Sequence, residues 1–173
     1  LEHIYNNPLI SYEKDEVNWN NNNGFTSGHD SVSVGTVNAS INTGAGDDNI
    51  YVSGNVNQSI SVGDGNDEIF IKGSANQNST INLGAGNNNL HVKGDVGLVN
   101  GGSGDDVVLV EGSTTNTVNL GAGNNELHIK GDAKHTIDTG LGDDKVFIEK
   151  DARNRINLGD GDNLLHIKGD AKN

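Results

Sequence analysis

Apolar and polar residues alternate in short stretches that return along most of the chain. In one of them Ile50 and Val52 flank Tyr51, and Asn49 precedes them. Alternation with a period of two predicts a strand with one buried face. The inward pairs predicted in this way are Ile50/Val52, Ile69/Ile71, Leu90/Val92, Val108/Val110, Leu127/Ile129, Val146/Ile148 and Leu165/Ile167.

A second, shorter strand is predicted before each Gly-x-Gly turn. It contributes one inward apolar residue, followed by a polar residue that is usually Asn. The predicted inward residues are Ile41, Ile60, Ile81, Val99, Val118, Ile137 and Ile156. No segment has the period of a helix.

The turns recur at nearly constant spacing. Their first glycines, at 44, 63, 84, 102, 121, 140 and 159, are separated by 19, 21, 18, 19, 19 and 19 residues. A degenerate copy, TSGHDSVSV at 26–34, adds an earlier coil. Such self-similarity indicates a solenoid whose units bury their apolar faces against each other. We therefore predict an all-β fold, a right-handed parallel β-solenoid (β-roll) of about eight coils, roughly 40 Å long.

The two ends of the repeat array differ. Residues 1–25 do not repeat and contain the single Trp, and we interpret them as an N-terminal cap or as a linker. Residues 26–173 form one solenoid domain with a C-terminal end that we expect to be uncapped. Because the last coil leaves Leu165 and Ile167 uncovered, we expect self-association through it.

Composition and charge limit the classes of partner that we expect the chain to bind. The 25 glycines lie at fixed intervals, which favours order over disorder. A formal net charge of −13 disfavours binding to nucleic acid and to anionic membranes, and makes a cation the natural partner. No apolar run approaches 18 residues, so no membrane insertion is expected.

The turns have the chemistry of a cation site. Glycine at both ends of Gly-x-Gly permits positive φ and lets backbone carbonyls converge. The glycines are Gly44, Gly46, Gly63, Gly65, Gly84, Gly86, Gly102, Gly104, Gly121, Gly123, Gly140, Gly142, Gly159 and Gly161. Two residues further on comes a short oxygen-bearing side chain: Asp30, Asp48, Asp67, Asn88, Asp106, Asn125, Asp144 or Asn163.

Stacked coils bring successive members of this column within about 5 Å of each other. Carboxylates at that spacing repel, whereas a hard cation between them takes oxygen ligands from side chains and turn carbonyls. We predict about five to seven Ca²⁺ ions, held more weakly where an Asn faces an Asp. A metal-free ladder of Asn and Asp hydrogen bonds is the alternative.

These residues resemble the RTX calcium-binding repeats, whose nonapeptide is Gly-Gly-x-Gly-x-Asp-x-apolar-x. NGGSGDDVVL at 100–109 matches it fully. The other copies replace the leading glycine by Thr43, Val62, Leu83, Leu120, Thr139 or Leu158, all predicted to point inward. The period of about 19 is similar to that of a 19-residue variant of the family, found in the ice-binding region of a giant bacterial RTX adhesin.

Two surface features leave alternatives open. One is an outward row made of Tyr51, Phe70, His91, Leu109, His128, Phe147 and His166. Its histidines are two coils apart, roughly 10 Å, too far to share a metal ion. The row is either a stacked ladder or a stripe for a carbohydrate, another surface ligand or self-association. The other feature is the pair of cationic turns at 130–136 and 149–155, which we interpret as solvated residues that balance the acidic face, with an anion site as the alternative.

No pair of carboxylates is unique and no nucleophile–base arrangement occurs, so we predict that the protein is not an enzyme. The RTX resemblance implies a calcium-dependent folding and structural module of a large secreted protein, an adhesin or a toxin, exported by type I secretion to the extracellular space or the bacterial surface. Alternatives are an ice-binding domain and a carbohydrate-binding module attached to a secreted enzyme.

The ice-binding alternative depends on a regular array of Thr and Asx at the turns. Only the Asx half is present, at Asp47, Asn66, Asn87, Asp105, Asn124, Asp143 and Asp162. The position between the glycines holds Ala45, Asp64, Ala85, Ser103, Ala122, Leu141 and Asp160, with no Thr.

Overall fold

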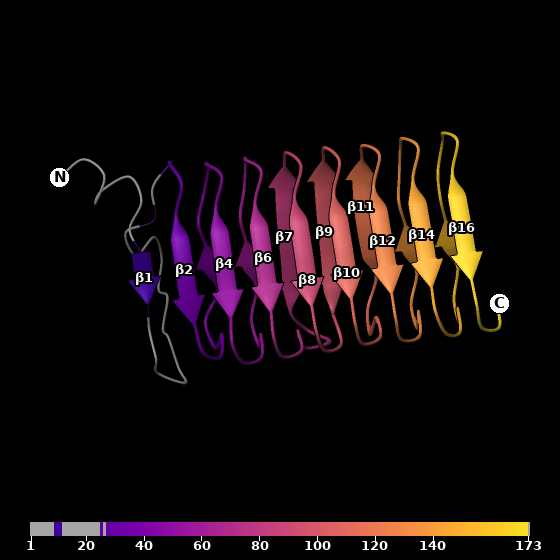
Figure 1. Cartoon of the computed structure of the whole chain (residues 1–173), viewed down its shortest axis with the longest axis horizontal. Helices are drawn as coiled ribbons and strands as arrows, with labels where there is room; N and C mark the ends of the chain where they lie inside the picture. Colours follow the sequence, from indigo (N-terminus) through magenta and orange to yellow (C-terminus); the bar gives the residue numbers. More distant parts are fainter. Residues whose placement is uncertain (1–8, 12–24, 26, 173) are drawn as a thin grey trace.

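A computed structural model describes residues 9–11, 25 and 27–172 of the chain. Two parallel sheets wind into a solenoid, which confirms the predicted fold class (Figure 1). The long sheet contains, in spatial order, β1 (Leu9–Ser11), β2 (Ser31–Val34), β4 (Asn49–Val52), β6 (Glu68–Ile71), β8 (Asn89–Val92), β10 (Val107–Val110), β12 (Glu126–Ile129), β14 (Lys145–Ile148) and β16 (Leu164–Ile167).

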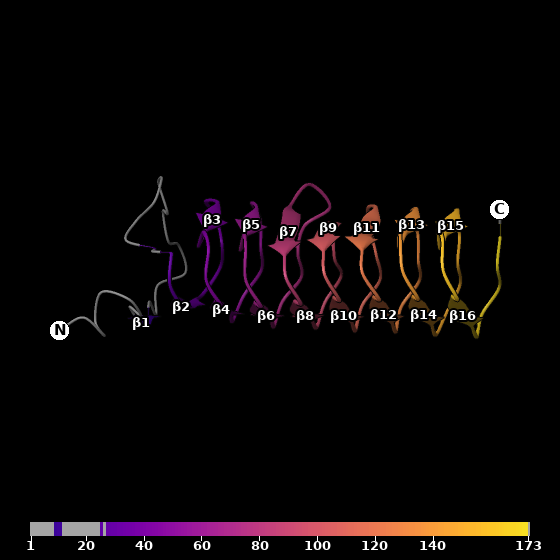
Figure 2. The ribbon, with the colours of Figure 1, turned by 90° about the horizontal axis from the view of Figure 1, so that it is seen from above.

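The strands before the turns form a second sheet that faces the first (Figure 2). Its strands are β3 (Ile41–Asn42), β5 (Ile60–Ser61), β7 (Thr80–Ala85), β9 (Leu98–Ser103), β11 (Val118–Ala122), β13 (Ile137–Asp138) and β15 (Ile156–Asn157). Seven coils, each with one short and one long strand, therefore follow β2, the long strand of the degenerate copy.

Every coil is in register with the next. Leu127 pairs with Val108 on one side and with Val146 on the other, so equivalent residues stack directly. The 21-residue step between Gly63 and Gly84 leaves this register unchanged, because its extra residues lie in a turn between the strands. In that turn the backbone N–H of Ser79 donates to the Asn76 carbonyl at 2.9 Å. Ile60 still pairs with Ile81 beyond that turn.

The core is a thin layer of Ile, Leu and Val between the two sheets. The inward pairs predicted from the alternation are buried from Ile50 to Ile148, whereas Leu165 in the last coil is 39% exposed. Residues at the leading position of the turns also point inward: Thr43, Val62, Leu83, Leu120 and Thr139 are buried, and Leu158 packs against the core. Burying an Ile or Leu side chain contributes about 1.5–3 kcal/mol, so the repeated pairs are the main source of stability.

The proposed N-terminal cap falls mostly outside the described residues. Within 1–25, the structure describes Phe25, which packs against the core, and strand β1, which pairs in parallel with β2. For the remainder of residues 1–25, a cap and a linker both stay predictions. In the described part of the chain, no helix has the length and hydropathy to span a bilayer.

The outward row forms two runs of ring contacts along the long sheet, one on each side of Leu109. Tyr51 and Phe70 stack with centroids 5.6 Å apart, and Phe70 meets His91 edge-on at 5.0 Å. His128 and Phe147 are 6.1 Å apart. These contacts confirm the stacked ladder and leave the binding stripe a prediction.

Glutamates of alternate coils link this row to both neighbouring coils. His91 Nε2 donates to Glu111 Oε1 at 2.8 Å, and Lys130 Nζ lies 3.2 Å from Glu111 Oε2. Two coils further along, His128 donates to Glu149 at 2.9 Å and Lys168 lies 3.8 Å from the same carboxylate. His91 and Lys130 hold the pKa of Glu111 below its usual range. The charged surface therefore repeats every two coils.

Candidate metal centres

The Gly-x-Gly turns have the backbone that the sequence predicts. Both glycines of all seven turns have positive φ, for example 85° at Gly121 and 127° at Gly123. A Cβ on Gly121 would collide with the carbonyl of Gly102 in the preceding coil. Glycine is therefore required both by the backbone conformation and by the close approach of carbonyls from adjacent coils.

The predicted metal-ligand column lies beside these turns, and we call it the inner column. It consists of Asp30, Asp48, Asp67, Asn88, Asp106, Asn125, Asp144 and Asn163. All are buried except Asn163 of the last coil. Each side chain from Asp48 onward accepts, through Oδ1, a hydrogen bond from the backbone N–H of the equivalent residue in the preceding coil, at 2.7 to 3.0 Å.

The second carboxylate oxygen behaves differently. Oδ2 of four inner-column residues, Asp48, Asp67, Asp106 and Asp144, is buried and accepts no hydrogen bond from the described residues. Leaving a buried acceptor unsatisfied costs about 1–3 kcal/mol, and more when it is charged. Oxygen atoms of this kind are the ligands that Ca²⁺ prefers. The donor set therefore fits the predicted cation.

Burial also makes three of these carboxylates, those of Asp48, Asp67 and Asp106, harder to ionise. Desolvation raises the pKa of Asp67 and of Asp106 to about 6, in spite of the N–H that donates to each. It raises the pKa of Asp48 as well. Within the described chain, no group of three or more His, Asp or Glu residues is placed to hold a metal ion. Each centre would therefore combine one or two carboxylates with backbone carbonyls.

The turns that carry an Asn of the inner column contain a hydrogen bond that the described Asp turns lack. In it, the side-chain amide of the Asn donates to a backbone carbonyl of the same turn. Asn88 Nδ2 donates to the Gly86 carbonyl at 3.1 Å, and Asn125 Nδ2 to the Gly123 carbonyl at 3.0 Å. Asn163 Nδ2 donates to the Leu158 carbonyl at 3.1 Å. Among the residues that the structure describes, no donor reaches the corresponding carbonyls of the Asp turns, which belong to Gly46, Gly65, Gly104 and Gly142.

The neighbouring Asx residues form an exposed outer row. The row comprises Asp47, Asn66, Asn87, Asp105, Asn124, Asp143 and Asp162. Here each side chain before Asp162 accepts a hydrogen bond from a backbone N–H of the following coil. The backbone N–H of Asn66, for example, donates to Asp47 Oδ1 at 2.7 Å. Between the glycines of the same turns, Leu141 is 59% exposed and interrupts any regular polar surface.

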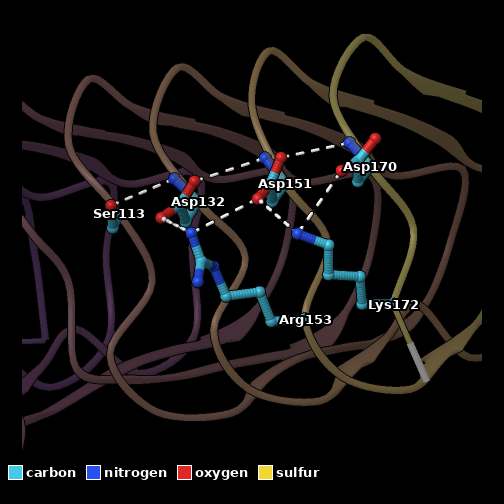
Figure 3. A network of polar contacts seen from close by, with 6 residues as sticks. All are labelled: Ser113, Asp132, Asp151, Arg153, Asp170 and Lys172. Carbon is cyan, nitrogen blue, oxygen red and sulfur yellow. Dashed lines mark hydrogen bonds and ion pairs between the residues drawn. The ribbon is translucent and has the colours of Figure 1, made fainter.

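A third set of stacked side chains, which we call the far column, lies at the opposite end of the long strands. It consists of Asn55, Ser74, Asp95, Ser113, Asp132, Asp151 and Asp170, joined by bonds from each backbone N–H to the preceding side chain. Its last three members are consecutive aspartates, and Figure 3 shows two cations beside them.

Each of these cations bridges two carboxylates. Arg153 Nη2 lies 3.1 Å from Asp132 Oδ2 and 3.3 Å from Asp151 Oδ2. Lys172 Nζ lies 3.6 Å from Asp151 Oδ2 and 3.3 Å from Asp170 Oδ2. Solvated cations are the sequence prediction for these turns, and that prediction does not include this column. The recurring Asp-Ala-cation triplets at 132–134, 151–153 and 170–172 were the signal that could have indicated it.

No protein-family model and no curated protein sequence matches the chain. Among solved structures, it is similar to a hyperactive, Ca²⁺-dependent, β-helical antifreeze protein from an Antarctic bacterium. The two share 24% sequence identity over 94% of this chain, with a TM-score of 0.53. The chain spans 66% of the length of that protein. At this identity the similarity establishes the β-helical fold.

Proposed function

We propose that this chain is a calcium-binding module that folds with calcium and acts structurally within a large secreted bacterial RTX protein, an adhesin or a toxin. One observation carries the proposal: four aspartates stacked along one side of the solenoid each bury a carboxylate oxygen that accepts no hydrogen bond from the described residues. These oxygen atoms suit a cation as ligands, and no cationic side chain of the described residues pairs with them.

The residues that would hold the ions are Asp48, Asp67, Asp106 and Asp144, each through Oδ2, together with carbonyls of the glycine turns. The Oδ1 ladder orients each carboxylate, because Oδ1 is already bound to an N–H of the preceding coil. A bound Ca²⁺ ion supplies the positive charge that offsets repulsion between neighbouring acidic turns.

Three further findings support the proposal. The chain is strongly acidic, its turns resemble RTX repeats, and the similar β-helical antifreeze protein is Ca²⁺-dependent. Extracellular calcium modules commonly bind with dissociation constants of about 10⁻⁴–10⁻³ M, which suits a chain that folds only after export. Binding to the folded state alone stabilises it, and several sites add their effects. We propose a non-catalytic role, since each acidic turn residue has counterparts in neighbouring coils.

The test is a calcium titration of the chelated chain followed by far-ultraviolet circular dichroism and calorimetry. We expect little β structure in chelator, a cooperative gain of it with Ca²⁺, and a much weaker response to Mg²⁺. Full β content in chelator that Ca²⁺ leaves unchanged would disprove the proposal.

Ice binding is the alternative that the antifreeze neighbour favours, and it has a separate test. The exposed row between the glycines mixes Ala, Asp, Ser and Leu, so it does not present the regular array that ice binding needs. We expect no thermal hysteresis from the calcium-loaded chain. A clear hysteresis gap would make the glycine-turn side a ligand-binding face.

A further inference from the structure

The inner column holds two kinds of turn, and only one kind has an unsatisfied oxygen. Asp67 and Asn88 are adjacent members of the column, and both use Oδ1 to accept an N–H from the preceding coil. The two side chains therefore have the same orientation, which places Asn88 Nδ2 where an Asp has Oδ2. At this position the Asp buries an acceptor, whereas the Asn buries a donor.

That donor is used. Asn88 Nδ2 bonds to the Gly86 carbonyl at 3.1 Å and to Asp106 Oδ1 in the next coil at 3.0 Å. Asn125 Nδ2 likewise reaches the Gly123 carbonyl at 3.0 Å and the Thr139 carbonyl of the next coil at 3.3 Å. Each amide thus links oxygen atoms of two successive coils, as a bound cation would.

We propose that the Asn turns of the inner column close on their own side-chain amide and take no calcium, so that ions bind only at Asp turns. The inference rests on the proposed calcium function and deepens it. Between Asp67 and Asn163 the column alternates strictly between Asp and Asn. This part of the solenoid therefore binds one ion for every two coils, and Asn88, Asn125 and Asn163 take the place of the other ions.

Substitutions that convert one kind of turn into the other test the inference. Asn125→Asp replaces a bonded donor with a second unsatisfied acceptor, so the calcium-loaded protein should bind one more ion than the wild type. Asp106→Asn should bind one fewer and should need less Ca²⁺ to fold. Bound calcium is counted by elemental analysis after equilibrium dialysis, and independently by native mass spectrometry.

Matched controls lie one residue earlier in the outer row. Asn124→Asp and Asp105→Asn make the same changes in charge on exposed side chains that already accept an N–H from the next coil. Both should leave the ion count unchanged. An effect of overall charge would instead move the controls together with the test variants.

The two proposals fail in different ways. If the wild type binds no Ca²⁺, the proposed function is wrong. The wild type can also bind Ca²⁺ while Asn125→Asp gains no ion and Asp106→Asn loses none. In that case the module is calcium-dependent, and the proposal that only Asp turns bind calcium is wrong. Asp106→Asn keeps this outcome measurable even if Asn125→Asp does not fold.

Discussion

Two columns of stacked carboxylates run along this solenoid at opposite ends of the long strands, and they are neutralised in different ways. In the far column, Arg153 and Lys172 each bridge two aspartates, so the chain provides its own positive charge. In the inner column, no side-chain cation of the described residues forms an ion pair with Asp48, Asp67, Asp106 or Asp144, and from Asp67 onward unsatisfied oxygens alternate with Asn amides.

Available space explains the difference. Asp132 and Asp151 in the far column have side chains 20% and 24% exposed, so a long side chain can reach them and keep its stem at the surface. Inner-column residues from Asp48 to Asp144 are at most 2% exposed, and glycine carbonyls of adjacent coils crowd the turn. Only a small group fits there, such as an amide or a bare ion.

Removal of calcium should have the largest effect, and it should act differently on the two columns. Chelation should abolish most β structure, because four buried carboxylates lose their counter-charge while the far column keeps Arg153 and Lys172. Hydrogen exchange at a limiting chelator concentration should show the inner turns opening before the far turns. Simultaneous opening of both would mean that the solenoid unfolds as one unit.

The second prediction compares two alanine substitutions within the inner column. Asp67→Ala removes a proposed charged ligand between two coils and should raise the calcium midpoint, the concentration at which half of the protein is folded, several-fold. Asn125→Ala leaves the Gly123 carbonyl without its donor and should destabilise the protein by about 1–3 kcal/mol at all calcium concentrations.

The readout of this second prediction is the folded fraction as a function of free Ca²⁺, followed by circular dichroism. Equal shifts of the midpoint would indicate that turn carbonyls, and not carboxylate charges, dominate binding.

The third prediction concerns pH in the chelated protein. Burial raises the pKa of Asp67 and Asp106 to about 6 in the folded state, against about 3.9 in an unfolded chain. The folded state therefore binds protons more tightly, and its stability rises as pH falls from about 7 through 6 to 4. Circular dichroism in chelator should show more β structure at pH 5 than at pH 7.5. A loss of structure over this range would contradict the raised pKa values.

The smallest expected effect is in the far column. Arg153→Ala should cost less than about 1 kcal/mol, because exposed ion pairs are weak, and added salt should reduce the cost further. The calcium midpoint should stay the same. Lys134→Ala, one coil earlier in the same Asp-Ala-cation triplet, is the matched control, and urea unfolding in saturating calcium measures both. A large shift in midpoint would show that the two columns are coupled.

Much of this architecture could be predicted from the sequence because each coil repeats the same local rules. Alternation identified the inward pairs from Ile50/Val52 to Val146/Ile148, and the glycine spacing identified the stacked turns with positive φ. The inner column followed from its fixed distance to those glycines. Whether it binds calcium stays a prediction.

What the sequence could not indicate depends on side-chain torsion and on contacts between coils. The residue types of Asp67 and Asn88 do not show that Oδ1 of each side chain faces the preceding coil. This orientation leaves Oδ2 of Asp67 unsatisfied and places the amide nitrogen of Asn88 at the equivalent position. The pairing of Glu111 with His91 and Lys130 likewise requires the exact stacking of three coils.

The pairing of glutamates with both neighbouring coils restricts how an array of this kind can gain or lose coils through recombination. Loss of 102–120 would keep every inward residue in register, yet it would remove Glu111 and set His91 beside His128 and Lys93 beside Lys130. Loss of 102–139 would set His91 beside Phe147 and Glu149, which restores the pairing that Glu111 makes now. The hydrophobic core has a period of one coil, whereas the charged surface has a period of two.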